Sequence, residues 1–469
     1  YLQHEMGGEA ADIRLQTFLR YGPEMVEFFH QRTAVQFLSG SAMPDFHPSP
    51  GAANGGRSVT AHPYDGRLLG DWLHRLRPPL ETISLGGMGI AGGADMAHFF
   101  NATRSPRSAL YAARRLLRHG WQRLRAGRGQ HLVNGNALVA RLLRSALDAG
   151  VRFQLNAPVV RLLQGPPGVS GAVLRSDGGE IHVEAGAVVL ACGGFPHDRQ
   201  RLAQVVPHAA EGYGHFSAAP PDNQGEGIRL GESVGGQFDT SLRHPLAWAP
   251  VSRVTLASGQ QLMFPHLVER AKPGVIAVLP NGKRFVNEAD SYHDFIAALL
   301  AATPAGDTPQ AWLLADRRAL RRYGLGHARP FPFTPTAWLR TGYLQRGNTL
   351  AELAKQCAID ANALAETVER FNHFASAGED VDFHRGASAY NRAQGDHQVT
   401  LGPLREGPFY AVRILPGSLG TFSGLQTDEH ARVLDEQQQP IPGLYAIGND
   451  MSSVMRGYYP SGDLRLSGG

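Results

Sequence analysis

Residues 187–195 have the sequence AVVLACGGF, in which a continuous apolar run passes directly into two glycines. A run that is apolar at every position is typical of a strand buried on both faces of a parallel sheet. Glycines after such a strand let the backbone approach a ligand at the carboxyl edge of the sheet, where open α/β sheets bind their ligands. The stretch predicts an α/β fold with a ligand at this edge, although a tight strand end without a ligand explains it equally well.

A second stretch, far along the chain, has the same arrangement. Residues 442–450 have the sequence PGLYAIGND, in which the apolar run Leu444–Ile447 is followed by glycine and short polar residues. Two such strand ends, separated by a long insert, favour the ligand-binding interpretation. The run VIAVL at Val275–Leu279 predicts another buried parallel strand, and Val151–Leu155 predicts a strand after a helix over Ala137–Leu147.

Length and composition indicate a globular protein of one large or two ordinary domains. The chain has 469 residues, of which 42% are hydrophobic and 18% charged. The pattern is less regular between about residues 240 and 401, which indicates a second, α+β domain inserted into the first. We predict that residues 1–254 and 422–469 form the first domain and that residues 255–421 form the inserted one. Within the insert, residues 350–374 predict two helices that are split near Asp360.

Neither a membrane span nor a metal site is predicted. No run of about 18 apolar residues is present, so no transmembrane helix is expected. The two cysteines, Cys192 and Cys357, are too few for a disulfide framework or a metal cluster and fit a reducing compartment, which predicts a cytoplasmic protein.

One strongly basic segment lies between Arg104 and Arg128. It contains eight arginines interleaved with Leu110, Leu116, Leu117 and Trp121. It is either a helix that contacts a membrane surface or nucleic acid, or a solvated helix whose apolar stripe faces the core. No recognised nucleic-acid motif accompanies it, so we expect no nucleic-acid partner, whereas peripheral membrane contact stays open.

Two further motifs combine polar groups with rigid loops. Residues 281–295, NGKRFVNEADSYHDF, join a turn to a dense polar cluster, and residues 452–462, SSVMRGYYPSG, continue from the second strand end. His266 and Glu269 precede the first motif, and they either line a substrate cavity or belong to the core or surface.

The chain here resembles a known superfamily. The motifs LACGGF, NQGEGIRLGESVGG, NGKRFVNEADSYHDF, GTFSGLQTDEHARVLD, GLYAIGN and VMRGYYPSG occur in the order found in the flavoproteins of the fumarate reductase and succinate dehydrogenase superfamily, with 3-ketosteroid 1-dehydrogenase the nearest branch. The resemblance runs from near Phe18 to about Gly462. It implies FAD, a Rossmann-like FAD-binding domain, and an inserted α+β catalytic or capping domain with the flavin ring between them.

Details of the motifs favour the ketosteroid branch. In the fumarate reductase pattern, an arginine that acts as the general acid stands where this chain has Tyr292. The same pattern has a substrate-binding histidine pair where this chain has residues 419–421. In the ketosteroid pattern, Tyr292 corresponds to the base, and Tyr459 corresponds to the tyrosine that polarises the ketone oxygen. The cofactor-binding positions that the resemblance implies are Val159, Ala191, Cys192, Gly193, Glu226, Gly420, Asn449, Ser461 and Gly462. Glu226 equally fits the start of a helix, and Val159 equally fits an ordinary strand.

The chain also departs from the family pattern. A GxGxxG strand–turn–helix unit is not found, so we expect the first βαβ unit of the FAD-binding domain, roughly 30 residues, to be missing. Residues 87–92 match the letters of GxGxxG but lack a preceding strand and a later acidic residue. Phe46 and His47 stand where the family has another tyrosine, and Asp463 stands where a glycine N–H joins the ketone site. Two alternatives therefore stay open: an enoate or dicarboxylate reductase like fumarate reductase, and a non-catalytic fragment that binds no cofactor.

We predict an FAD-dependent dehydrogenase that introduces or reduces a C=C bond next to a carbonyl, with hydride transfer to N5 of the flavin. Tyr292 takes the proton, and Tyr459 with a backbone N–H near Gly462 polarises the ketone. A phenol titrates near pH 10, so holding a phenolate at pH 7 needs about 4 kcal/mol from its surroundings. His293 is a rival base with a better matched ordinary pKa. An extended segment would place Tyr292 and His293 on opposite faces, so that only one reaches the substrate. The expected substrate is a small hydrophobic ketone, with a steroid as one candidate; the sequence identifies no electron acceptor.

Overall fold

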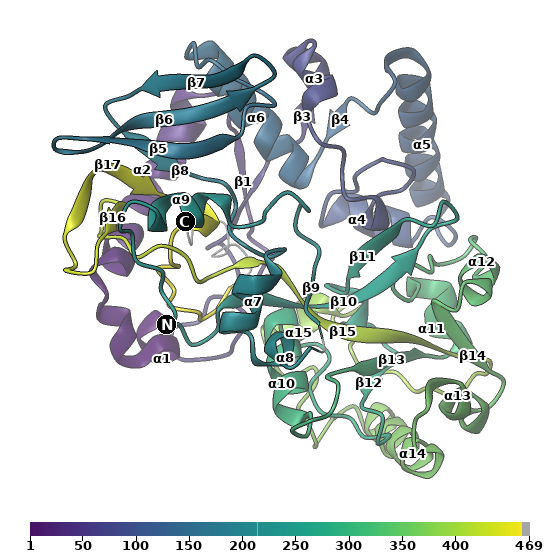
Figure 1. Cartoon of the computed structure of the whole chain (residues 1–469). Helices are drawn as coiled ribbons and strands as arrows, with labels where there is room; N and C mark the ends of the chain where they lie inside the picture. Colours follow the sequence, from purple (N-terminus) through teal and green to yellow (C-terminus); the bar gives the residue numbers. More distant parts are fainter. Residues whose placement is uncertain (213, 462–469) are drawn as a thin grey trace.

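The computed structural model describes residues 1–212 and 214–461, so the predicted site residue Gly462 lies outside the described residues. A seven-stranded sheet dominates one half of the molecule, in the order β11-β10-β15-β13-β12, with β14 and β9 also paired to β15 (Figure 1). Its strands are β9 Phe216–Ser217, β10 Leu246–Thr255, β11 Gln261–Pro265, β12 Val275–Val278, β13 Ala311–Ala315, β14 Leu344–Gly347 and β15 Phe409–Thr421.

The two predicted strands pair with each other in a smaller sheet, but Val189 of the first is 52% exposed, so the prediction that this strand is buried on both faces is wrong. This sheet has the order β16-β17-β8, made of β8 Val188–Leu190, β16 Arg432–Leu434 and β17 Pro440–Ala446. β17 and β8 are parallel, with Leu444 opposite Val188 and Ala446 opposite Leu190. The carboxyl ends of the two strands therefore lie side by side, although Leu190 and Ala446 are 256 positions apart in the sequence.

The remaining strands form an antiparallel sheet and two short ribbons. β5 Val159–Gly165, β6 Gly168–Ser176 and β7 Gly179–Glu184 form the three-stranded sheet. β1 Phe37–Ser39 pairs with β2 Val59–Ala61, and β3 Tyr64–Asp65 pairs with β4 His131–Leu132.

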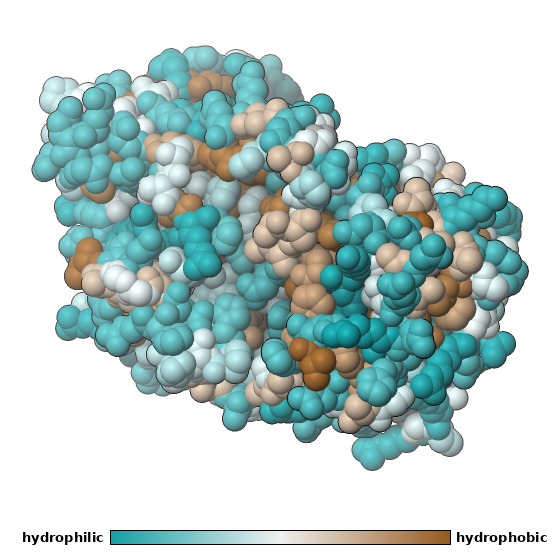
Figure 2. All heavy atoms as spheres, turned by 90° about the horizontal axis from the view of Figure 1, so that it is seen from below, coloured by the Kyte–Doolittle hydropathy of each residue, from teal (hydrophilic) through white to brown (hydrophobic). Residues whose placement is uncertain are grey.

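Helices surround these sheets, and α5 stands at the margin of the molecule (Figure 1). Their bounds are α1 Leu2–Met6, α2 Ile13–Arg32, α3 Trp72–Arg75, α4 Ala94–Phe100, α5 Pro106–Ala126, α6 Asn134–Asp148, α7 Arg199–Val205, α8 Pro207–Ala210, α9 Glu226–Glu232, α10 Tyr292–Ala302, α11 Arg317–Tyr323, α12 Thr336–Arg340, α13 Leu350–Cys357, α14 Ala361–Ala377 and α15 Ala389–Gln394. Seen from below, the surface is hollowed between the two halves, and hydrophobic residues lie along this hollow (Figure 2). Among the described residues, no helix combines the length and apolar character that crossing a bilayer requires.

Two further strand predictions are wrong, and two helix predictions are confirmed. β12 is buried as expected but pairs antiparallel with β13. Its residues alternate between two hydrophobic clusters, so both faces are covered, and a continuous apolar run does not reveal strand direction. Residues 151–155 form no strand, and Val151 is 50% exposed. The helix predicted over Ala137–Leu147 is α6, and Asp360 caps α14 where the two predicted helices separate.

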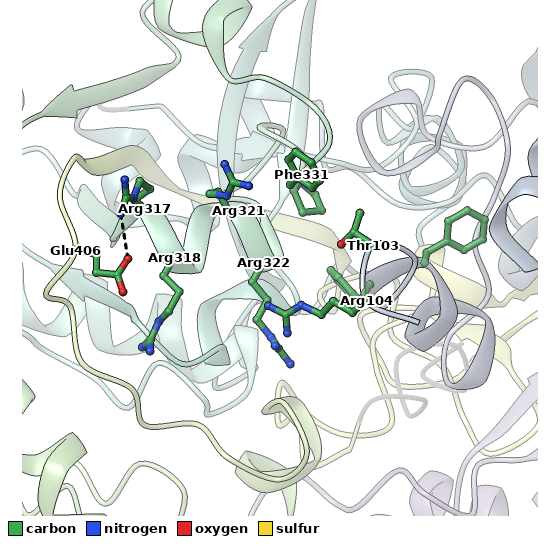
Figure 3. Close-up of a pocket in the computed structure, with 11 residues that line it drawn as sticks. Thr103, Arg104, Arg317, Arg318, Arg321, Arg322, Phe331 and Glu406 are labelled. Carbon is green, nitrogen blue, oxygen red and sulfur yellow. Dashed lines mark hydrogen bonds and ion pairs between the residues drawn. The ribbon is translucent and has the colours of Figure 1, made fainter. Parts of the chain in front are cut away.

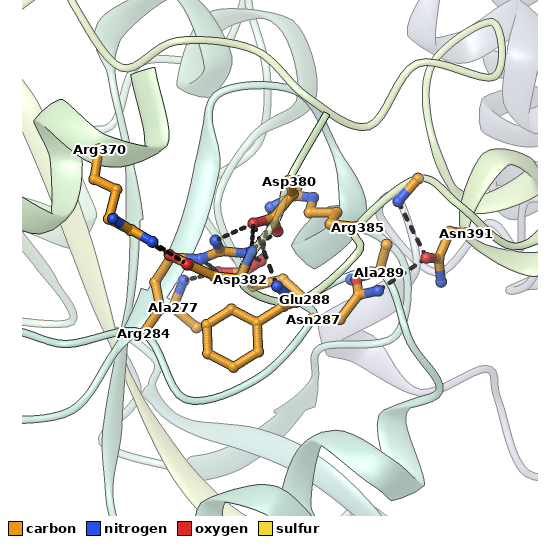
Figure 4. A network of polar contacts seen from close by, with 12 residues as sticks. Ala277, Arg284, Asn287, Glu288, Ala289, Arg370, Asp380, Asp382, Arg385 and Asn391 are labelled. Atoms are coloured by element: carbon orange, nitrogen blue, oxygen red, sulfur yellow. Dashed lines mark hydrogen bonds and ion pairs between the residues drawn. The ribbon is translucent and has the colours of Figure 1, made fainter. Parts of the chain in front are cut away.

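A buried ion cluster holds the segment that leads into α10. Arg284 donates to both carboxylate oxygens of Glu288 and also to Asp380, with N–O distances of 2.7–3.2 Å. Arg385 donates to Glu288 at 3.0 Å and to the carbonyl oxygen of Val275 at 2.7 Å. Glu288 also accepts from the backbone N–H of Ala277 on β12 at 3.0 Å (Figure 4). The two arginines thereby tie residues 284–288 to the large sheet and to the loop after α14.

The charges of this cluster depend on one another because all are withdrawn from water. Burial raises the pKa of Glu288, but Arg284 and Arg385 outweigh it and hold the pKa at about 2. Removing one partner of a buried ion pair leaves an uncompensated charge, which typically costs about 3–5 kcal/mol. The pair between Arg370 and Asp382 is exposed, so its contribution is much smaller.

We expect Glu288→Gln to lower the free energy of unfolding by about 3–5 kcal/mol, because Arg385 loses its carboxylate partner. The matched control Asp382→Asn, at the exposed pair, should change it by less than about 1 kcal/mol. Urea unfolding followed by circular dichroism measures both. Equal, small losses in the two variants would contradict the assigned role of the cluster.

The same carboxylate predicts a pH dependence. Because folding lowers the pKa of Glu288 from 4.5 to about 2, its contribution is fully present above the unfolded pKa and is lost as the pH falls through the folded one. The stability difference between wild type and Glu288→Gln should therefore shrink progressively between about pH 4.5 and about pH 2. A difference that persists unchanged over this range would show that the ionised carboxylate does not stabilise the fold.

Candidate active site

Two tyrosines that are far apart in the sequence meet by their hydroxyl groups. Tyr292 is the first residue of α10, which the side chain of Ser291 caps by accepting from the N–H of Asp294. Tyr459 lies in the loop after β17. The two hydroxyl oxygens are 2.6 Å apart, and the tyrosines are 8% and 3% exposed, respectively. The structure thus brings together the two residues predicted to act as base and ketone donor.

The surroundings of the two phenols are apolar and aromatic. The cluster also contains Phe46, Leu242, Ala247, Ala249, Tyr390 and Phe422. The ring of Phe46 lies 5.8 Å from that of Tyr292, 5.6 Å from that of Tyr459 and 4.7 Å from that of Tyr390, measured between centroids. Phe46 therefore occupies the centre of the site, at the position where the family pattern has a tyrosine.

Tyr390 is a member of the site that the sequence analysis did not identify. It lies in the first turn of α15 and is 3% exposed. Burial raises the pKa of its phenol above the ordinary range. Within the described part of the chain, its hydroxyl makes no hydrogen bond to protein, which leaves it available to a bound molecule. The only signal in the sequence is an aromatic residue at the start of a short helix, which is too common to be informative.

His293 is not suited to act as the base. Its Nδ1 accepts the backbone N–H of Trp248 at 3.2 Å, so the lone pair of this nitrogen is occupied. Burial lowers its pKa to about 3. The ring packs edge-on against Tyr459 at 5.4 Å, so His293 supports the site as a neutral side chain. The extended segment considered from the sequence is wrong, because a helix begins at Tyr292 and both residues face the cluster.

His266 and Glu269 belong to the core beside the site. His266 is fully buried and hydrogen-bonds Glu269 at 2.6 Å and Ser252 at 2.7 Å. Ser252 in turn contacts the hydroxyl of Tyr343 at 2.8 Å. These bonds satisfy the polar atoms of His266, so of the two alternatives left open by the sequence the structure favours the core.

A buried cation lies close to the phenols. Arg270 is 1% exposed and donates to the carbonyl oxygens of His266, Glu288 and Asp290. Asp290 lies two positions before Tyr292. Its charge acts electrostatically on both Tyr390 and Tyr292. At Tyr390 this charge opposes the rise in pKa that burial causes. Arg270 lies outside the RFVNE motif, so the sequence gives no signal for its place beside the site.

The predicted cofactor residues converge at the ends of β8 and β17. Asp450, after β17, accepts from the backbone N–H groups of Cys192 and Gly194, after β8, the latter at 2.9 Å. Burial, and then the charge of Asp450, raise the pKa of the Cys192 thiol to about 11, so it is not a thiolate. Glu226 starts α9 and acts electrostatically on both Cys192 and Asp450, which places it beside the same edge.

Glycines allow a close approach of backbone and polar groups at this edge. A Cβ at Gly194, whose φ is 77°, would lie 2.1 Å from Oγ1 of Thr421, and one at Gly420 would lie 2.8 Å from Nδ2 of Asn449. Asn449 and Glu226 are half-buried. A glycine-lined strand edge with available amide and carboxylate groups fits a dinucleotide cofactor such as FAD.

Two further predicted cofactor positions lie at this same edge, whereas Val159 and Ser461 lie on other segments. Ala191 and Gly193 lie in the same strand end as Cys192, and Gly193 has a φ of 94°. Val159 begins β5 in the three-stranded sheet, on a strand that packs near α9. Ser461 is 4% exposed and follows Pro460, whose carbonyl accepts from the N–H of Phe46 at 2.9 Å.

Comparison with known proteins agrees with this geometry. The family model described as FAD binding domain matches residues 1–464. The chain belongs to this family. It is therefore an FAD-dependent oxidoreductase. The predicted fold class is confirmed by this match and by the match to a solved structure described below.

Relatives within the family cover nearly the whole chain. The 4-oxocyclohex-2-ene-1-carboxylate 5-dehydrogenase of Sinomonas cyclohexanicum is 39% identical over 94% of this chain and 76% of the relative. The 3-oxosteroid 1-dehydrogenase of Mycolicibacterium smegmatis is 33% identical over 98% and 81%. The crystal structure of 3-ketosteroid delta1-dehydrogenase from Sterolibacterium denitrificans, in complex with 1,4-androstadiene-3,17-dione, matches with a TM-score of 0.88 and 34% identity over 100% of this chain and 86% of that chain.

We expect Gly194→Ala to lower the FAD content of the purified protein at least tenfold, because the new methyl group collides with Thr421 at the cofactor edge. Gly186→Ala, where a Cβ meets nothing within 4 Å, is the matched control and should leave the content unchanged. The ratio of flavin to protein absorbance measures both. Asn449→Ala should lower the content without disturbing the backbone, and full occupancy in both site variants would place FAD elsewhere.

Proposed function

We propose that this enzyme removes a hydride and a proton from adjacent carbons of a ring ketone, forming a C=C bond conjugated with the carbonyl. The observation that carries the proposal is the 2.6 Å contact between the Tyr292 and Tyr459 hydroxyls inside a buried aromatic cluster. A ketone oxygen and its α-carbon are two bonds apart. Two neighbouring phenols can therefore address both atoms of one substrate.

Each phenol has a distinct part in the proposed reaction. Tyr459 donates its O–H to the ketone oxygen, which makes the α-hydrogen more acidic, and Tyr292 takes that proton. FAD, held by the residues at the ends of β8 and β17, would supply at N5 the acceptor for the hydride of the neighbouring carbon. Arg270 is a positioning residue, since it donates to the carbonyl oxygens of Glu288 and Asp290 in the segment that leads to Tyr292. In the reductive direction, Tyr292 returns the proton.

The surroundings favour a neutral, apolar ketone as the substrate. The cluster side chains other than the tyrosines are all hydrocarbon, and the guanidinium of Arg270 is occupied by backbone carbonyls. The nearby His47 is already paired with the carboxylates of Asp294 and Glu5. Burial lowers the pKa of His47, but the hydrogen bonds to these two carboxylates outweigh burial and raise the pKa to about 9. These features support a 3-ketosteroid-like substrate, in keeping with the names of several relatives.

Of two other substrate classes, one has support and the other does not. The similarity to the cyclohexene carboxylate dehydrogenase favours a smaller ring ketone with a carboxylate. A dicarboxylate such as fumarate is disfavoured, because Leu419, Gly420 and Thr421 replace the histidine pair of that pattern and offer no cation.

We also propose a division of labour between two domains. Residues 1–254 and 422–469 hold FAD at the ends of β8 and β17, and residues 255–421 supply Tyr292, Arg270 and Tyr390. Support comes from the seven-stranded sheet, most of whose strands lie in the second range, although β9 and β10 precede residue 255.

The direct test mixes the FAD-loaded enzyme anaerobically with a saturated 3-ketosteroid, with 4-oxocyclohexanecarboxylate, or with succinate. We expect the steroid to bleach the flavin absorbance fastest and to yield a product with a conjugated enone absorbance. Bleaching by the carboxylated ketone alone would shift the substrate class. Bleaching by succinate alone would support the fumarate reductase-like alternative, and a colourless protein that cannot be loaded with FAD would support the non-catalytic one.

We expect Tyr292→Phe to slow flavin reduction by the preferred ketone about 10²–10⁴-fold, since it removes the proton acceptor. Tyr459→Phe should slow it about 10²–10³-fold through loss of the donor to the ketone oxygen. Tyr410→Phe, a buried tyrosine on β15 outside the cluster, is the control and should react at the wild-type rate. Stopped-flow absorbance gives the rates, and an unimpaired Tyr292→Phe enzyme would exclude Tyr292 as the base.

A further inference from the structure

Helix α5 presents its apolar residues to solvent. Leu110, Leu117, Trp121 and Leu124 are 72%, 76%, 55% and 88% exposed, respectively. Their spacing of seven, four and three residues places them on one face of an α-helix. The interpretation of this segment as a stripe that faces the core is therefore wrong. Single exposed leucines are common on protein surfaces, but an aligned set on one long helix indicates an interaction surface.

The opposite face of α5 fixes the helix to the protein. Ser108, Ala112 and Gln122 are its buried residues. Arg115 pairs with Asp95 at 2.8 Å, and Arg123 donates to the carbonyl oxygen of Gly86 at 3.0 Å. The apolar stripe is thus held outward by a fixed attachment.

A row of arginines flanks the stripe. Arg107, Arg114, Arg118 and Arg125 follow one another at helical spacing, beside the line of Leu110 to Leu124. All four are exposed, and none forms a salt bridge with a carboxylate in the part of the chain that the structure describes. Residues 96–147 contain no aspartate or glutamate. The surface is cationic as well as apolar.

Further arginines lie next to the start of the helix. A pocket of about 490 Å³ is lined by Arg104, just before α5, and by Arg318, Arg321 and Arg322 of α11 (Figure 3). Arg322 is paired with Asp396, while Arg321 lies over the ring of Phe331 at 4.7 Å. Glu406, which pairs with Arg317, also lines the pocket, so the arginines at this end of the stripe are only partly neutralised.

We propose that α5 is a membrane-docking helix, which lies in the interface of an anionic lipid bilayer. Leucines and Trp121 enter the boundary between headgroups and acyl chains, and the arginine row contacts lipid phosphates. The stripe from Leu110 to Leu124 is about 21 Å long, so it contacts the bilayer along its length. A second copy of this chain is the weaker occupant, because its α5 would bring the same unbalanced arginines against this one.

The test uses the FAD-loaded full chain and co-sedimentation with vesicles of phosphatidylglycerol or of phosphatidylcholine. We expect binding to phosphatidylglycerol that weakens at high salt, and at least tenfold weaker binding to phosphatidylcholine. Leu117→Ser with Leu124→Ser should lower binding at least tenfold. Val381→Ser with Val399→Ser, two exposed valines outside α5, is the matched control and should bind as wild type. Urea midpoints equal to wild type would show that the stripe variant is folded.

A second readout follows Trp121. Its fluorescence should shift to shorter wavelength when phosphatidylglycerol vesicles are added, and Trp121→Phe should abolish that shift. Equal sedimentation of wild type and the Leu117→Ser, Leu124→Ser variant would overturn the proposal. The proposal would also be overturned if the wild type bound no vesicles but formed a concentration-dependent dimer that the Leu117→Ser, Leu124→Ser variant did not form. That result would identify a second copy of the chain as the occupant of the stripe.

Discussion

The carboxylate of Glu288 is buried without access to water, and the active site depends on how its charge is balanced. Arg284 and Arg385 both donate to it, and the backbone of Ala277 on β12 does so as well. These bonds fix residues 284–288 relative to the large sheet. Four residues later the chain reaches Tyr292, and Arg270, which donates to the carbonyl of Glu288, fixes the intervening turn. The phenol of Tyr292 is thus held in place by charge pairing in the core.

The end of β15 joins the two halves of the site. Leu419 and Phe422 pack against the tyrosine cluster, whereas Gly420 and Thr421 lie against Asn449 and Gly194 at the cofactor edge. The ladder between β15 and β10 is irregular near this point, between Leu246 and Trp248. Such irregularities bend a strand and redirect its side chains, and they are frequent next to active sites. One short segment therefore sets the distance between the glycine-lined strand edge and the phenols.

Much of this arrangement could be predicted from the sequence because it depends on local patterns. The runs before Cys192 and Gly448 predict two strands that end in glycine, and both strands form. Their burial could not be predicted, since Val189 is 52% exposed, and similar strand ends do not by themselves reveal that the two strands pair. The antiparallel direction of β12 could not be predicted, since burial on both faces gives the same apolar run in either orientation. The outward stripe of α5 is likewise not encoded locally, because helical periodicity shows which residues share a face but not which face meets the core. Tyr390 and Arg270 reach the site only through tertiary packing.

The central claim is that Tyr292 and Tyr459 act together on one ketone, and a double-mutant cycle on the rate of flavin reduction tests it most directly. If Tyr459 polarises the carbonyl for proton transfer to Tyr292, the Tyr459 hydroxyl should have little effect on the rate of flavin reduction once Tyr292 is removed. The Tyr292→Phe, Tyr459→Phe double variant should then react about as slowly as the slower single variant. Losses that multiply, so that the double variant is slower by the product of the two single effects, would contradict this account.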